Sequence, residues 1–424
     1  MTMRLRTVVR SSSATALLPL LVGFVLLALG DDLTAWVTPH YWTSATGSAA
    51  FALPFIAAAC AGSAAWEAAR LAKGRVFEQA PVRGPLAITV MVLLPVLTTG
   101  LIALLAALAM AAIAADVPFG IPHLGILAVA AAVLLANTLV GSVIGRIMPG
   151  VLAAPLALIG SFFANAYPAS WNVFWLRHLV GGGLNSCCSV DTSVDDKALL
   201  GTVIFTSGVS VAALVLVRLR GRAIPLAAAA TCVAGSLSLA WLFVRDLGPE
   251  PTSPRTVSAL VCETTGRYRI CLWPEVDNPS RVRQDTRTAA ENLERAGILV
   301  PRTLTMAAHP EPGATKLGIT PTAQPEDIPG GIASGLLPQP PACALEGRPY
   351  PAGEATVAIE GWLQVSAGAP EGTVEARLDP QTARLLKQLR EVPPKQQLAW
   401  YENNRQAMSA CGPKPQLSTA GGRP

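Results

Sequence analysis

The residues that could carry out chemistry are sparse in this chain and are not arranged for catalysis. The sequence contains no GxxxxGK[ST] phosphate-binding loop, so the chain alone is not expected to bind and hydrolyse ATP in that way. HExxH, GxSxG and SxxK motifs are also absent. Four carboxylates of the second half lack the spacing that would pair them for acid–base work: Glu263, Glu275, Glu360 and Glu371. We therefore predict that the chain is not an enzyme.

The cysteines predict disulfides rather than a metal site. Four of the eight lie in the C-terminal region: Cys262, Cys271, Cys343 and Cys411. They allow three pairings, and the β-rich stretches 257–262 and 268–273 favour a hairpin that joins Cys262 to Cys271, which leaves Cys343 for Cys411. Cys187 and Cys188 are adjacent in the sequence, which leaves open whether they form a disulfide or are free thiols. With four histidines and no Cys/His cluster, we expect no metal and no other cofactor.

The composition is that of a membrane protein in the first part and of an ordinary globular chain in the second. Hydrophobic residues make up 51% of the 424 residues and charged residues 14%, against about 25% charged residues in soluble proteins. Residues 1–250 hold 14 Lys/Arg and 10 Asp/Glu, and the remaining residues hold 18 and 17. The net charge of +5 thus comes mainly from the apolar part, which indicates membrane topology and no nucleic-acid partner.

Seven apolar runs are long enough to be spans of a lipid bilayer. None contains Asp, Glu, Lys, Arg or His, which argues against a transporter driven by protons or sodium. The runs cover residues 12–30, 49–65, 86–115, 124–144, 151–166, 198–217 and 223–244. The predicted fold is an all-α membrane bundle of about seven helices (1–247), a small α+β domain (255–411) and a disordered tail (412–424).

Positive charge divides unevenly between the two sets of connecting segments, which predicts the orientation in the cell membrane. One set has only Arg177 and Lys197. The other has eleven positive residues: Arg4, Arg6, Arg10, Arg70, Lys73, Arg75, Arg83, Arg146, Arg218, Arg220 and Arg222. We therefore expect a cytoplasmic N-terminus and, after an odd number of spans, an extracytoplasmic C-terminal domain. A signal peptide cleaved near Ala28 is an alternative interpretation of the first run.

The C-terminal domain shows a mixture of helix, strand and irregular signals. A helix is expected from about residue 278 to 297, and another from Asp379-Pro380 to 392, followed by a last helix to about 410. Residues 310–341 are rich in Gly and Pro and predict an irregular excursion. Residues 355–365 fit a strand or a buried helix equally well.

Three features of the membrane part have more than one interpretation. Gly141 and Gly145 form a GxxxG pair, which favours close helix contact within the chain over a dimer seam. The cytoplasmic segment 66–83 carries both signs of charge and fits either docking of a partner or anchoring of two spans. The mildly polar residues inside the runs could line a path or be satisfied by helix packing: Thr98, Thr99, Asn137, Thr138, Ser207 and Ser236.

These features resemble ABC-2-type transporter permeases. The resemblance rests on the spans, on Trp-Glu-Ala-Ala-Arg-Leu at 66–71 between the second and third spans, and on the semi-apolar segment 167–197 before the sixth. The Ala-rich style and Cys-Leu-Trp-Pro-Glu at 271–275 are similar to actinobacterial permease-like membrane proteins. The resemblance implies that the first cytoplasmic loop contacts a separate ATPase subunit, here through Glu67, Arg70 and Arg75. The seventh span and the large outer domain depart from the family.

The leading hypothesis is therefore the membrane subunit of an ABC-type exporter. It would act as a homo- or heterodimer, powered by a separate ATP-binding chain. The alternative is a membrane-anchored binding or sensory module, in which the helical bundle carries an outer domain that recognises a partner.

Overall fold

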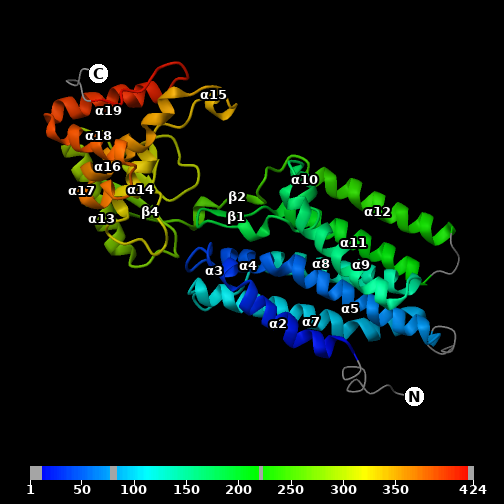
Figure 1. The fold of residues 1–424 in the computed structure, drawn as a ribbon. Coiled ribbons are helices and arrows are strands. Elements are labelled where there is room, and N and C mark those ends of the chain that lie inside the picture. Colours follow the sequence, from blue (N-terminus) through cyan, green and yellow to red (C-terminus); the bar gives the residue numbers. More distant parts are fainter. Residues whose placement is uncertain (1–11, 77–83, 219–222, 419–424) are drawn as a thin grey trace. The chain divides into compact units, whose positions relative to one another are not determined.

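The chain forms two compact units, Met1–Ser253 and Pro254–Pro424 (Figure 1). The computed structural model describes residues 12–76, 84–218 and 223–418. The division between the units lies inside the interval 247–255 that the sequence left between its two predicted domains. At this point the apolar helices give way to a Pro-containing stretch that cannot continue a helix.

Among the residues that the structure describes, six helices of the first unit are long and apolar enough to cross a membrane. They are α4 (Trp42–Ala49) with η1 (Ala50–Ala52) and α5 (Leu53–Lys73), α7 (Pro85–Ala114), α8 (Leu124–Ile147), α9 (Gly150–Ala166) with η2 (Tyr167–Ser170), α11 (Asp196–Arg218) and α12 (Ala223–Val244). An α-helix satisfies most of its backbone polar groups internally, as a bilayer requires. Pro95 and Pro155 are accommodated inside α7 and α9.

Within the described residues, six of the seven predicted runs lie in helices of this length, and the first run lies in a shorter apolar helix. The first predicted span is the shorter helix α2 (Ala14–Ala28). Its 15 residues rise about 22 Å, which is less than the roughly 30 Å of a hydrocarbon core. The helix breaks at Leu29, and the next turn, α3 (Gly30–Thr34), carries Asp31 and Asp32.

Hydrogen bonds fix α2 and α3 along the neighbouring α4–α5 segment. The Ser13 hydroxyl lies 2.7 Å from the Ser63 hydroxyl, and the Ser48 hydroxyl donates to the Leu33 carbonyl at 2.6 Å. Residues 13–33 therefore run antiparallel to residues 48–63. Together, α2 and α3 extend along most of the length of their neighbour.

The connecting segments group at two opposite ends of the bundle. At one end, the Arg146 guanidinium donates to the Val217 carbonyl at the end of α11 and to the Thr89 hydroxyl at the start of α7. At the other end, the Tyr41 hydroxyl donates to the Thr192 carbonyl at 2.9 Å. Segments that the charge pattern assigned to the same side thus lie at the same end of the bundle.

The segment between α9 and α11 is folded into short elements. They are α10 (Phe174–Arg177), η3 (Leu184–Ser186) and β1 (Thr192–Val194), which pairs with β2 (Thr252–Pro254). His178 is buried here, with its Nε2 2.9 Å from the Gly248 carbonyl, while the Thr202 hydroxyl donates to the His178 carbonyl. Burial lowers the pKa of the His178 imidazole.

The second unit is an α+β domain around a four-stranded sheet of order β3-β4-β5-β6. The hairpin β3 (Val261–Thr265) and β4 (Tyr268–Leu272) is antiparallel, and β5 (Thr303–Thr305) and β6 (Ala314–Lys316) continue the sheet in parallel. The helices are α13 (Pro279–Arg295), α14 (Ile328–Leu336), α15 (Ala342–Leu345), α16 (Thr356–Ala367), α17 (Glu371–Glu375), α18 (Pro380–Glu391) and α19 (Pro394–Met408), with short turns η4 (Val257–Ala259) and η5 (Pro351–Ala355). Tyr268, Ile270 and Leu272 alternate onto the buried face of the sheet.

Three expectations for this unit are refined. The stretch 310–341 is only partly irregular, since it contains β6 and α14, and the undecided stretch 355–365 is α16. Gln416 holds part of the tail in place, because its N–H donates to Asn404 at 2.7 Å and its carbonyl accepts from Trp400 at 2.7 Å. The prediction of disorder from residue 412 is therefore corrected for 412–418, and 419–424 lie outside the described residues.

Candidate functional site

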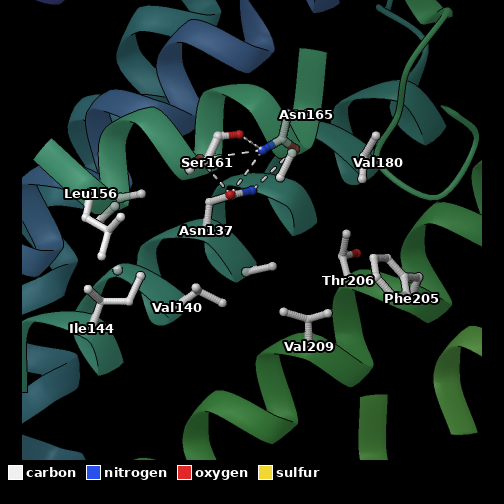
Figure 2. A pocket seen from close by; sticks show the side chains of 16 residues that line it. Asn137, Val140, Ile144, Leu156, Ser161, Asn165, Val180, Phe205, Thr206 and Val209 are labelled. Atoms are coloured by element: carbon white, nitrogen blue, oxygen red, sulfur yellow. Dashed lines mark hydrogen bonds between the residues drawn. The ribbon is translucent and has the colours of Figure 1, made fainter. Parts of the chain in front are cut away.

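A cavity of about 260 Å³ lies between α8, α9 and α11 of the membrane unit (Figure 2). Its walls are mainly apolar, with Val140 and Leu156 on one side and Phe205 and Val209 of α11 on the other. No Asp, Glu, Lys, Arg or His is among the described residues that line it. The cavity is therefore suited to an apolar or amphiphilic molecule rather than to an ion.

Two amides and a hydroxyl form the polar part of this cavity. The Oδ1 of Asn137 on α8 accepts from the Ser161 hydroxyl at 2.7 Å and from the Asn165 amide nitrogen at 3.1 Å. Ser161 and Asn165 are four residues apart, so they share one face of α9. The Asn137 nitrogen also donates to the Val133 carbonyl at 2.9 Å. These hydrogen bonds satisfy polar groups for which the hydrocarbon core of a bilayer offers no partner.

Sequence reasoning found only one member of this cluster. Asn137 is one of the mildly polar residues that the sequence singles out in the spans, whereas Ser161 and Asn165 are not among them. Their i, i+4 spacing inside an apolar run was the available signal. Thr138, in contrast, bonds within its own helix, to the Leu134 carbonyl, and has a structural role.

The residues predicted to contact an ATPase subunit lie at one end of α5. Glu67 is only 5% exposed, because its carboxylate accepts the Ser13 backbone N–H at 2.6 Å and binds the Arg70 guanidinium at 3.2 Å. Arg70 is half exposed. Arg75 is exposed just beyond the helix, which ends at Lys73. The structure thus brings Glu67 and Arg70 together and leaves Arg75 apart.

This arrangement separates two roles within the predicted contact region. Glu67 holds the start of α2 against α5, while Arg70 and Arg75 present charge at the surface. The first part of the segment 66–83, up to Lys73, belongs to α5. Residues 77–83, including Arg83, lie outside the described residues.

The cysteines of the second unit are paired as the sequence favoured. Cys262 lies opposite Cys271 on neighbouring strands, and Cys343 is next to Cys411. Cys187 and Cys188 are also paired with each other, while Cys60 and Cys232 are free thiols inside helices. No group of three His, Cys, Asp or Glu suited to a metal ion occurs in the part of the chain that the structure describes.

A second cavity of about 260 Å³ lies on the sheet of the second unit. Arg269 on β4 and Thr303 and Thr305 on β5 line it, together with His309 and Glu311 from the following loop. Arg269 and Thr303 are register partners on parallel strands, so their side chains project to the same face. This face offers hydroxyl, cationic and anionic groups to a polar ligand.

The fold and these sites define a multi-pass membrane protein with a C-terminal α+β domain. The model of a family described as a domain of unknown function, DUF7224, matches residues 270–411, about a third of the chain. The second unit therefore carries a DUF7224 domain, which begins in β4 and ends at Cys411. No curated protein and no solved structure matches the chain. None of these comparisons assigns the first unit to the ABC-2-type permeases.

Proposed function

We propose that this chain is the membrane subunit of an ABC-type exporter that works with a separate ATPase chain. The observation that carries the proposal is the cavity between α8, α9 and α11. There, Asn137, Ser161 and Asn165 offer hydrogen bonds to an amphiphilic substrate among apolar walls. Such pockets, mostly apolar with a few placed polar groups, are typical of small-molecule sites.

The energy for transport must come from another chain under this proposal. The described lining of the cavity has no titratable side chain through which proton movement could be coupled. The sequence has no phosphate-binding loop of its own. Arg75, exposed beyond the end of α5, is the position that we assign to contact with the ATPase.

Co-purification from native membranes tests this assignment. The tagged wild-type protein should recover a chain that carries a GxxxxGK[ST] motif, and Arg75→Glu should reduce that recovery at least tenfold, because reversing an interfacial charge places like charges together. Arg218→Glu is the matched control, since Arg218 is also exposed at the end of a helix but belongs to α11. It should leave the recovery unchanged.

The alternative is an anchored binding module. It is favoured by the cavity on the sheet of the DUF7224 domain, whose lining includes the charged or polar side chains of Arg269, His309 and Glu311. If no ATP-binding chain is recovered, or if Arg75→Glu and wild type recover it equally, the exporter proposal fails and this alternative takes its place. Its own test is loss of ligand-dependent thermal stabilisation of the full chain in Arg269→Gln.

A further inference from the structure

A second hollow of the membrane unit, the basic cavity, lies where α5, α8 and α9 end or begin. Its volume is about 500 Å³. Arg70 and Lys73 of α5 and Arg146 of α8 line it, together with Trp66 and the first residues of α9. Among the described lining residues there is no carboxylate, and the nearby Glu67 is bonded to Arg70. The described lining of the basic cavity is therefore net positive.

Two features of the fold shape the basic cavity for a negatively charged group. Arg146 is fixed by the Val217 carbonyl and the Thr89 hydroxyl, so the wall from α8 is preorganised. The N-terminus of the 17-residue helix α9 opens at Gly150 into the same cavity and adds its partial positive charge to the three cations.

An apolar groove of about 540 Å³ continues along the helices from this point. Leu17 and Leu20 of α2, Ala59 of α5 and Leu158 and Ile159 of α9 line it. Trp66 lines both the groove and the basic cavity. On α5, residues 59, 63, 66, 70 and 73 follow helical spacing, so the two hollows lie on the same face of that helix.

We infer that the basic cavity and the apolar groove together bind an anionic phospholipid. The phosphate headgroup lies among Arg70, Lys73 and Arg146, and an acyl chain follows the groove along α5 and α9. A headgroup site at the end of the spans, beside a tryptophan, matches where lipid phosphates and interfacial aromatics occur in a bilayer. Binding of free phosphate would account for the basic cavity but not for the adjoining apolar groove.

Native mass spectrometry of the full-length purified protein tests this site with dioleoyl phosphatidylglycerol and dioleoyl phosphatidylcholine as probes. We expect the anionic lipid to bind at least tenfold more tightly. Lys73→Gln, which changes an exposed side chain, should weaken its binding about fivefold, as should Arg70→Gln. Arg218→Gln is the matched control and should bind as wild type does. Equal melting temperatures in phosphatidylcholine show that the variants are folded.

The groove is tested separately with Ala59→Phe, which narrows it without changing charge. This variant should weaken phosphatidylglycerol binding, and excess inorganic phosphate should compete only weakly. Equal affinity for the two lipids would overturn the inference, as would Lys73→Gln binding like Arg218→Gln. If phosphate competes fully and Ala59→Phe has no effect, the basic cavity binds free phosphate and the assignment to a lipid is wrong. None of these outcomes depends on the proposed exporter function.

Discussion

At the scale of single residues, the amide pair Asn137 and Asn165 has both a structural and a functional interpretation. Each amide compensates the other among apolar helices, which is sufficient reason for the pair to exist. The same groups border a cavity, and a substrate could exchange bonds with them. Mutations distinguish the structural from the functional interpretation, because the effects of two mutations in a structural pair on the free energy of unfolding are not additive.

We predict a coupling free energy of about 0.6–1.7 kcal/mol between Asn137 and Asn165. In Asn165→Leu, Asn137 loses one of its partners, whereas the double variant with Asn137→Leu removes both groups and should recover part of the lost stability. Thermal unfolding in detergent measures the cycle. Thr231→Val, an exposed residue of α12 bonded only to its own helix among the interactions described, should show no coupling to Asn165. If the losses of stability in the two single variants simply add up in the double variant, the interaction between the two amides contributes nothing to stability.

The sequence allowed only part of this site to be predicted, for a physical reason. Asn137 is visible as an amide in an apolar run, but its partners depend on which face α9 turns toward α8. Glu67 shows the same limit, since its neighbours in sequence suggest a solvent-exposed loop. Its burial follows from the Ser13 N–H, which lies 54 residues away along the chain.

At the scale of elements, close packing of α8 against α5 depends on two glycines. A Cβ at Gly141 or Gly145 would overlap the carbonyl oxygen of Ala61 or Ala65. The GxxxG pair is thus used within the chain, as the sequence favoured. The small side chains of α5 allow the backbones to approach, which is the usual basis of helix association in membranes.

Gly145→Ala is expected to destabilise the protein by about 1–3 kcal/mol, because the added methyl group must push α5 and α8 apart. Gly160→Ala is the matched control, since Gly160 is also inside a membrane helix but a Cβ there meets nothing within 4 Å. It should leave the melting temperature unchanged or raise it. A dimer seam would give a different result, in which Gly145→Ala changes the oligomeric state and leaves the monomer's stability intact.

The ends of the elements were harder to predict than their existence. Because the predicted runs exclude charged residues, the second run ends at residue 65. In the structure, α5 continues to Lys73. Arg70 and Lys73 lie in its last turn, where their positive charges complement the negative end of the helix dipole. The first run was predicted as a full span, but Gly30, Asp31 and Asp32 shorten its apolar helix. Composition therefore locates the helices, whereas tertiary contacts and charges at their termini set the boundaries.

At the scale of the whole molecule, one orientation in the membrane would be consistent with both the charge pattern and the cysteine pairs. Arg70, Lys73 and Arg75 lie at the same end of α5, and Arg146 at the end of α8 bonds to α7 and α11. The positive-inside rule predicts that this end faces the cytoplasm. If the α2–α3 segment also crosses the bilayer, the DUF7224 domain lies outside, where disulfides such as Cys343–Cys411 persist.

Cysteine labelling in intact cells tests this orientation. An impermeant thiol reagent should not label Arg75→Cys or Arg218→Cys until the membrane is permeabilised, whereas Lys395→Cys, exposed on α19, should be labelled at once. The parent protein is the control for background, since its described cysteines are paired or lie within helices of the membrane unit. Labelling of all three variants only after permeabilisation would place the DUF7224 domain in the cytoplasm. In that case α2 does not cross the bilayer, the number of crossings is six, and the cysteine pairs would face a reducing compartment.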